Sequence, residues 1–271
     1  MKLLITDIDG TLLPFGHTAL SPMIVDFFHT LHTQHVLVTC ATGKPFHRTV
    51  PIAQTLGISL PVICANGALI KDPITQKTLF RQPMAEKIVC DVIQLLQHDP
   101  RCQLYMETEE ALFFLENPLI PLDAWRHLRP GWNPPIAYSP AHDLKTILKE
   151  MPHKIAVSVD PQDLETVEER LRSRFGTSLN IFHPKPDIID LTPNNTDKGT
   201  AARFLATYLG VKSQDIIAIG DEMNDLSLCE IAGQSLVRCY APQALLDQAD
   251  LIVENGDSAL ILAIKKVLAL P

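Results

Sequence analysis

The sequence predicts an α/β fold with a mostly parallel sheet, into which a second, smaller α+β domain is inserted. Two observations lead to this prediction. Short apolar runs typical of buried strands alternate with amphipathic helical segments up to about residue 80, and the same alternation returns after about residue 196. Between these stretches, strand and helix patterns no longer alternate one by one. The middle of the chain is therefore expected to form an insertion.

The first stretch predicts a βαβαβ unit. Its strands are expected at Leu3–Thr6, Val36–Thr39 and Val62–Ala65, and its helices are expected to begin at Ser21 and at Pro45. Ser21 is a favourable N-cap and is followed by a proline at the first helical position, after which apolar residues recur at helical spacing. This segment therefore provides the start of a parallel sheet.

The remaining elements are predicted from the same periodicities. In the middle segment, we expect helices at Met84–His98 and Leu164–Phe175, and strands at Cys102–Met106, Leu112–Leu115, Lys154–Val159 and Asp187–Thr192. In the last stretch, we expect helices at Lys198–Leu209, Asp225–Ala232 and Ser258–Leu270, and strands at Ile216–Ile219 and Leu251–Val253.

Composition limits the classes of partner. The chain has 271 residues with 23 Lys and Arg against 31 Asp and Glu, so no overall positive field exists and we expect no nucleic acid and no membrane as partner. Six cysteines at irregular spacings, without a Cys-x-x-Cys pair, argue against a zinc site or a disulfide framework. The N-terminal residues do not resemble a signal peptide, so we expect a cytoplasmic protein. We also expect it to be a monomer or a weak homodimer.

Four short polar segments lie at predicted strand ends or helix starts of the α/β part. They are Asp7-Ile8-Asp9-Gly10-Thr11, Thr42-Gly43-Lys44, Asp197-Lys198-Gly199 and Gly220-Asp221-Glu222-Met223-Asn224-Asp225. Ligands of open α/β sheets bind at the carboxyl ends of the strands, so these segments are expected to meet at one site. No Gly-x-Gly-x-x-Gly follows the first strand, which argues against a dinucleotide-binding protein.

In this order, the four segments match the four motifs of the haloacid dehalogenase (HAD) superfamily. The chain resembles that superfamily's Cof-type phosphatases over essentially its whole length. The resemblance implies a Rossmann-like catalytic core formed by residues 1–82 and 185–271. Only about 30 residues separate Asp7 from Thr42, which leaves no room for a cap at that point. Residues 83–184 are therefore expected to be a type IIB cap, the domain that selects the substrate.

The carboxylates point to a divalent cation. A phosphomonoester is dianionic, and a carboxylate can attack it only when a cation and fixed donors neutralise the phosphoryl oxygens. Asp7 and Asp221, each at the tip of a different strand, are expected to bind Mg²⁺, which prefers oxygen ligands. The resemblance implies that the backbone carbonyl of Asp9 is a third ligand. Asp225 is expected to hold a metal-bound water instead of the ion itself.

The two aspartates of the first segment are expected to share the chemistry. Asp7 is the expected nucleophile, which forms an aspartyl-phosphate. Asp9 is expected to protonate the leaving oxygen and later to deprotonate the attacking water. The dehalogenases and cation-pumping ATPases of the superfamily lack an aspartate at the position of Asp9. The resemblance therefore implies a phosphatase or phosphomutase and argues against dehalogenation.

Phosphate binding is expected from four residues. Thr42 offers a hydroxyl and Gly43 an unobstructed backbone N–H. Lys198 is expected to hold the phosphoryl group and to offset the charge of the two aspartates. Asn224, by resemblance, donates to the phosphate. Lys44 stands where the family usually has arginine, so the positive charge is kept and the planar guanidinium is lost.

Three further features are interpreted more simply. Asn66-Gly67-Ala68 matches a family turn and is interpreted as structural. Arg238-Cys239-Tyr240-Ala241-Pro242 replaces a usual Gly-Asn-Ala turn and is expected only to support the site. Trp125 and Trp132 lie in a proline-rich stretch and are expected to pin a surface loop, with a pocket wall for the leaving group as the alternative.

The sequence therefore predicts a Mg²⁺-dependent phosphatase that acts on a small phosphorylated metabolite, such as a sugar phosphate or a phosphorylated cofactor or its precursor. Two alternatives stay open. One is a phosphomutase on the same fold, which returns the phosphoryl group to its substrate. The other is a non-catalytic metabolite-binding protein, against which the intact nucleophile and its neighbouring acid argue.

Overall fold

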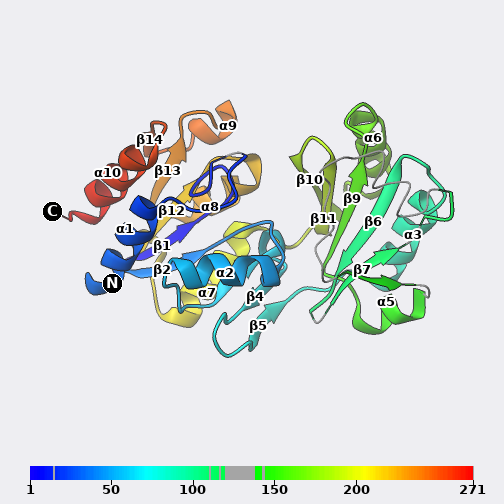
Figure 1. The fold of residues 1–271 in the computed structure, drawn as a ribbon, viewed down its shortest axis with the longest axis horizontal. Coiled ribbons are helices and arrows are strands. Elements are labelled where there is room, and N and C mark those ends of the chain that lie inside the picture. The colour runs from blue at the N-terminus through cyan, green and yellow to red at the C-terminus, as the bar shows by residue number, and fades with distance from the viewer. Residues whose placement is uncertain (15, 110, 116, 120–137, 142–143, 271) are drawn as a thin grey trace. The chain divides into compact units, whose positions relative to one another are not determined.

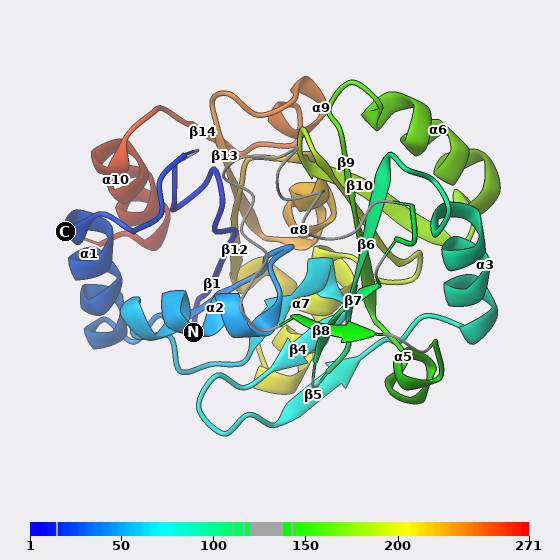
Figure 2. The same ribbon diagram turned by 45° about the vertical axis from the view of Figure 1, so that its right-hand side comes forward.

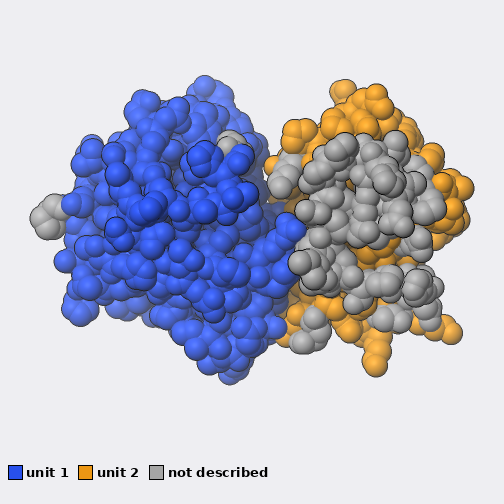
Figure 3. Space-filling view, in the orientation of Figure 1, with its two compact units in different colours: residues 1–80, 196–271 blue, residues 81–195 orange. Residues whose placement is uncertain are grey.

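The chain folds into two units (Figure 3). Each unit has its own apolar core. The core unit consists of residues 1–80 and 196–271, and the inserted unit consists of residues 81–195. The computed structural model describes residues 1–14, 16–109, 111–115, 117–119, 138–141 and 144–270. The loop expected around Trp125 and Trp132 lies outside the described residues.

A parallel sheet forms the centre of the core unit, with strand order β14-β13-β12-β1-β2 (Figure 1). Every pair of neighbours in this sheet is parallel. The strands are β1 (Leu3–Thr6), β2 (Leu37–Cys40), β12 (Ile216–Gly220), β13 (Gln234–Arg238) and β14 (Leu251–Val253). Because all five strands run in one direction, their carboxyl ends lie along a single edge, as the sequence predicts.

Helices cover both faces of this sheet (Figure 1). They are α1 (Pro22–Thr33), α2 (Phe46–Thr55), α7 (Lys198–Leu209), α8 (Leu226–Ile231), α9 (Gln243–Leu246) and α10 (Asp257–Leu268). Successive strand residues face opposite ways, so Leu4 packs in the cluster that contains α1 and α10, while Leu3 and Ile5 pack with α7. The predicted cap of α1 is confirmed, because the Ser21 hydroxyl accepts the N–H of Ile24 at 3.2 Å.

Short elements complete the core unit. A small three-stranded sheet contains β3 (Val62–Cys64), β4 (Leu69–Lys71) and β5 (Thr78–Arg81). Three 3₁₀ turns are η1 (Ala65–Gly67), η2 (Ser213–Asp215) and η3 (Met223–Asp225). An isolated parallel bridge between Ala41 and Ile63 connects the end of β2 to β3. No helix among the described residues is long and apolar enough to cross a membrane.

The inserted unit is an α+β layer of its own. Its sheet has the strand order β10-β11-β9-β6-β7-β8, and among these described strands only the β7–β8 pair is parallel. The strands are β6 (Cys102–Glu107), β7 (Leu112–Leu115), β8 (Tyr138–Ala141), β9 (Lys154–Val159), β10 (Leu179–Lys185) and β11 (Ile188–Pro193). Helices α3 (Glu86–Leu96), α5 (Leu144–Glu150) and α6 (Leu164–Phe175) pack on the sheet through one shared apolar cluster (Figure 2).

The point where the chain returns to the core unit differs from the sequence expectation. Residues 185–195 are expected in the core, as are residues 81–82 at the first crossing, and the structure places both stretches in the inserted unit. The reason is strand pairing: β10 and β11 form an antiparallel hairpin, and β11 also pairs with β9. The fold class itself is confirmed, namely a parallel α/β core with an inserted α+β unit.

Candidate active site

The predicted site segments follow three neighbouring strands of the parallel sheet. Asp7 follows β1, Thr42 comes shortly after β2, and Asp221 follows β12. β1 lies between β2 and β12, so the sheet itself brings the three segments together at its carboxyl edge. The remaining segment, third in chain order, begins α7, where the Asp197 side chain caps the helix by accepting the N–H of Thr200 at 2.6 Å.

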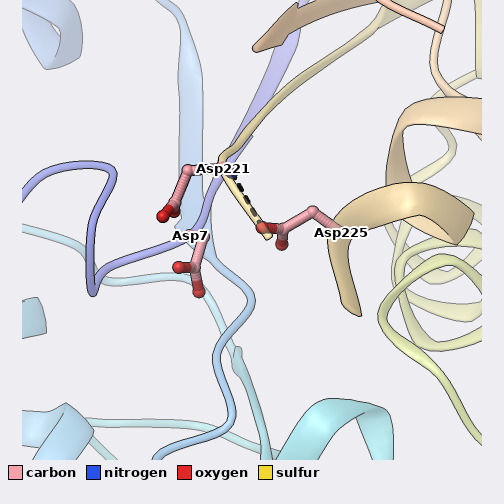
Figure 4. Close-up of side chains that lie close together, drawn as sticks. All are labelled: Asp7, Asp221 and Asp225. Carbon is pink, nitrogen blue, oxygen red and sulfur yellow. Dashed lines mark hydrogen bonds between the residues drawn. The ribbon is translucent and has the colours of Figure 1, made fainter. Parts of the chain in front are cut away.

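Three carboxylates form the centre of the site (Figure 4). Asp7, Asp221 and Asp225 are buried, and one carboxylate oxygen of each lies within 4.8 Å of the others. They come from three different elements, namely the loop after β1, the end of β12 and the turn before α8. Lys198 is fully buried beside them, and its Nζ donates to Oδ1 of Asp7 at 2.7 Å and to Oδ1 of Asp225 at 2.6 Å.

Asp221 and Asp225 differ in what their oxygens do. Oδ2 of Asp225 accepts the N–H groups of Asp221 at 3.0 Å and Glu222 at 3.1 Å, while its Oδ1 is held by Lys198. Oδ1 of Asp221 accepts the hydroxyl of Thr11 at 2.6 Å. Oδ2 of Asp221 is buried and has no hydrogen-bond partner in the described part of the chain. Asp221 therefore offers an oxygen to a ligand, whereas Asp225 is engaged by the protein at both oxygens.

Burial determines how these groups ionise. It raises the pKa of Asp7 to about 7, although Lys198 opposes the shift. Burial and the negative charge of Asp7 raise the pKa of Asp221 to about 8, against the effect of the Thr11 hydrogen bond. Burial disfavours the ammonium of Lys198, but Asp225 and Asp7 outweigh burial and raise its pKa. The single buried ammonium of Lys198 therefore does not offset the cost of ionising Asp7 and Asp221 together.

The centre of the site fits a hard divalent cation. Its donors are all oxygens, its carboxylates are crowded, and one carboxylate oxygen is buried without a partner among the described residues. Mg²⁺ prefers such oxygen ligands and completes its coordination with water and substrate phosphate. On this arrangement, Asp7 and Asp221 are the side chains that could hold the ion.

Asp9 lies in a different environment from Asp7. Its side chain is 46% exposed, and Oδ2 forms an ion pair with Nζ of Lys44 at 2.6 Å. Lys44 is held by its backbone, because its N–H donates to the Thr42 hydroxyl at 3.1 Å and its carbonyl accepts the N–H of Ala65 at 3.1 Å. The lysine that replaces the usual arginine is therefore placed against the expected acid and base of the reaction.

The expected phosphate-binding residues lie near a turn that sequence analysis interpreted as structural. Thr42 is buried, with its N–H bonded to the carbonyl of Ile63 at 2.9 Å. Nδ2 of Asn224 donates to Oδ1 of Asn66 at 2.9 Å. A methyl group added at Gly43 would lie 3.0 Å from the same Oδ1. The structure therefore brings the second and fourth segments together on either side of Asn66.

Tyr240 is a contact to the first segment that sequence analysis did not identify. Its hydroxyl donates to the carbonyl of Gly10 and accepts from Nε of Arg238 at 3.3 Å, and the guanidinium lies 5.6 Å from the ring centroid. Both residues belong to the stretch that departs from the usual family turn. The departure from the family turn was a sequence signal that this stretch has a role of its own. The contact between Tyr240 and Gly10, however, could not be predicted from sequence.

Fold and site together define the class of protein. A parallel α/β core that gathers two aspartates after β1, a buried lysine and further aspartates after β12 is suited to hydrolysis of phosphate esters. The model of the haloacid dehalogenase-like hydrolase family matches residues 4–262. The chain belongs to this family, and it is an enzyme of the phosphatase class within it.

Curated relatives agree with this assignment, and a solved structure agrees with the fold. The HMP-PP phosphatase of Cronobacter sakazakii is 26% identical over 240 residues, which are 89% of this chain and 85% of that protein. The HMP-PP phosphatase of Enterobacter sp. (strain 638) is 26% identical over 254 residues, covering 91% and 88%. The crystal structure of a haloacid dehalogenase-like hydrolase from Bacteroides thetaiotaomicron matches with a TM-score of 0.80 at 23% identity, covering 98% of this chain and 99% of that one. That structure has the same fold.

Proposed function

We propose that the protein is a Mg²⁺-dependent phosphatase that hydrolyses small phosphomonoesters through an aspartyl-phosphate on Asp7. The observation that carries this proposal is the contrast between two aspartates on one loop. Asp7 is buried against Lys198, with Nζ and Oδ1 2.7 Å apart, while Asp9 is half exposed and paired with Lys44. A nucleophile requires a fixed position, and an acid and base requires access to the leaving group and to water.

In the first step, a carboxylate oxygen of Asp7 attacks the phosphorus, and the bond between phosphorus and the ester oxygen breaks. Asp9 donates a proton to the departing oxygen, which leaves as an alcohol. In the second step, Asp9 takes a proton from water as the water oxygen attacks the phosphorus. Inorganic phosphate leaves, and Asp7 is restored as a carboxylate. Lys198 holds Asp7 in place through both steps.

Mg²⁺ would be held by Asp7, Asp221 and the backbone carbonyl of Asp9, with Asp225 in an outer position. When bound, it would neutralise charge on the phosphoryl oxygens. The partnerless oxygen of Asp221 supports its role as a ligand, and the engagement of both Asp225 oxygens supports the outer position. The hydroxyl of Thr42, the N–H of Gly43, the ammonium of Lys198 and the amide of Asn224 would bind the phosphate.

The proposed substrates are sugar phosphates or a phosphorylated cofactor or its precursor. Two relatives are named HMP-PP phosphatase, which supports inclusion of HMP-PP among the compounds to be tested. The inserted unit, as a type IIB cap, would select among such metabolites. Three further expectations stay predictions. They are a cytoplasmic location, a monomeric or weakly dimeric state, and the absence of nucleic-acid and membrane partners.

The test is inorganic phosphate release from a panel of sugar phosphates, nucleotides, pyridoxal phosphate, flavin phosphates and HMP-PP, with Mg²⁺ and with a chelator. We expect release that requires Mg²⁺. Asp7→Asn should abolish turnover and keep the fold, whereas Asp26→Asn on the exposed surface of α1 should behave as the wild type. Substantial turnover by Asp7→Asn would contradict the assignment of the nucleophile.

The same panel separates the alternatives. A phosphomutase would convert a sugar phosphate into its isomer without phosphate release and would need an activating bisphosphate. A non-catalytic binding protein would bind a panel compound without changing it. Either result would replace the proposed hydrolysis.

A further inference from the structure

The buried turn η1 between β3 and β4 has an unusual backbone. Ala65, Asn66 and Gly67 have φ values of 49°, 53° and 97°, so three successive residues lie in the left-handed region. Ala65 and Asn66 are almost fully buried. Residues other than glycine adopt this conformation at an energetic cost and keep it only where the surroundings fix it. Such strain occurs most often at functional sites, which makes the contacts of this turn informative.

The backbone of the turn holds the second site segment from both sides. The N–H of Asn66 donates to the carbonyl of Thr42 at 3.0 Å, and the N–H of Ala65 donates to the carbonyl of Lys44 at 3.1 Å. Gly43 lies between these two acceptors, with the Asn66 side chain against it. The left-handed turn therefore sets the position of the loop whose Thr42 hydroxyl and Gly43 N–H are the proposed phosphate donors.

The side chain of Asn66 reaches the fourth segment. Its Oδ1 accepts one hydrogen of the Asn224 amide, with Nδ2 and Oδ1 2.9 Å apart. Oδ1 of Asn224 is buried and has no hydrogen-bond partner among residues that the structure describes. The bond to Asn66 is thus the contact that fixes the plane of the Asn224 amide. Because Nδ2 carries two hydrogens, the second one is left with a defined direction.

The turn also touches the third segment. A Cβ added at Gly67 would lie 2.1 Å from the carbonyl oxygen of Asp197, the N-cap of α7. Only glycine permits this approach to the helix that begins with Lys198. The single turn η1 therefore contacts the second, third and fourth site segments.

We infer that Asn66 is a positioning residue of the phosphate-binding site, which orients the amide of Asn224 and holds the loop around Gly43. This inference rests on the proposed function, because it assigns phosphate binding to Thr42, Gly43 and Asn224. The Asn66 side chain is engaged by the amide of Asn224 and lies against Gly43, so we assign it an action through these neighbours and not a contact with substrate.

Asn66→Gly tests the side chain while it preserves the backbone, because glycine adopts the left-handed conformation freely. We expect kcat/KM to fall about tenfold and the dissociation constant of inorganic phosphate, measured by calorimetry, to rise about tenfold, as for loss of one aligned hydrogen bond to a charged group. Gln76→Gly is the matched control. Gln76 also has a positive φ, 61°, and lies in the turn between β4 and β5, so this variant should behave as the wild type.

A double-mutant cycle shows whether Asn66 acts through Asn224. If it does, Asn66→Gly combined with Asn224→Ala should lower phosphate affinity no further than Asn224→Ala alone. A second variant, Asn66→Asp, retains an acceptor for the amide but adds a negative charge beside Gly43. We expect it to bind phosphate more weakly than Asn66→Gly binds it.

The outcomes distinguish the inference from the proposed function. If the wild type binds phosphate but turns over no panel compound, the proposed hydrolysis is contradicted. The phosphate dissociation constants of the Asn66 variants then still test the role of Asn66. Phosphate affinity of Asn66→Gly within twofold of the wild type, or fully additive effects with Asn224→Ala, would overturn the inference. A wild type that binds no phosphate would overturn both.

Discussion

Replacement of Asp221 by asparagine is expected to stabilise the metal-free protein at neutral and alkaline pH. Burial, together with the charge of Asp7, raises the pKa of Asp221 from 3.8 to about 8. Ionised Asp221 therefore destabilises the folded state relative to the unfolded chain. Asparagine is similar in size, is uncharged, and retains an oxygen that can accept the hydroxyl of Thr11. The variant thus removes the charge with little change in packing.

The magnitude follows from the difference between the folded and unfolded pKa values. From 3.8 to about 8, at about 1.4 kcal/mol per pH unit, the upper bound is about 6 kcal/mol well above pH 8 and about 5 kcal/mol at pH 8, where Asp221 is half ionised. Asp7 and Asp221 titrate as an interacting pair, so part of this cost falls on Asp7, and we expect a gain of about 2 kcal/mol in the free energy of unfolding. When folding raises the pKa of an acid, the folded state is favoured at pH values below the unfolded-state pKa, where the group is protonated. This contribution is lost as the pH rises through the folded-state pKa. The gain should therefore shrink from pH 8 to pH 5 and vanish near pH 4.

The assay is denaturant unfolding in chelator at several pH values for the wild type, Asp221→Asn and Asp26→Asn. The Asp26 variant removes the same charge from the exposed surface of α1 and controls for net charge. Added Mg²⁺ should stabilise the wild type at pH 8 and stabilise Asp221→Asn much less. If Asp221→Asn is less stable than the wild type at pH 8 in chelator, or its gain does not depend on pH, the account of a charge-crowded cation site is wrong.

Substitutions at three further positions test other contacts of the site. Lys44→Met removes the ion pair with Asp9 at 2.6 Å and should lower kcat/KM about tenfold, more for poor leaving groups, while Lys44→Arg should restore most of the rate in steady-state kinetics. Tyr240→Phe removes the hydroxyl that donates to the carbonyl of Gly10 and should lower the free energy of unfolding by about 1 kcal/mol, measured by denaturant titration. Gly67→Ala places a methyl group against the carbonyl of the α7 N-cap and should cost more than about 2 kcal/mol in the same titration.

The fold and the centre of the site could be predicted because their signals are local. The run Leu3–Thr6 is fully buried in the sheet, and its apolar residues alone indicate a central strand. Parallel strands place their carboxyl ends at one edge, so the sequence alone predicts that Asp7, Thr42 and Asp221 meet there. The hydrogen bonds between the side chains of the site could not be predicted from sequence. The bond between Lys198 and Asp7, for example, joins residues that are 191 positions apart.

The elements that sequence analysis missed depend on distant partners. β13 (Gln234–Arg238) shows little alternation, yet Ser235 within it is buried. Its N–H and hydroxyl both donate to Oδ2 of Asp250, at 2.7 and 2.9 Å, so a polar residue is tolerated inside the sheet. The hairpin strand β10 was missed for a related reason, because a bulge between Phe182 and Lys185 interrupts its period of two.

The spacing of Asp7 and Asp9 does not by itself distinguish their roles, because residues two apart on a strand face the same side. The chain leaves β1 at Thr6, however, and the following loop buries the first side chain and exposes the second, to 8% and 46%. Each aspartate then has its own lysine, one fully buried at position 198 and one partly exposed at position 44. A buried carboxylate held by a buried ammonium has a fixed position, whereas the more exposed pair of Asp9 and Lys44 is open to solvent. The loop conformation, and not the sequence spacing, therefore supports the proposed division between nucleophile and acid.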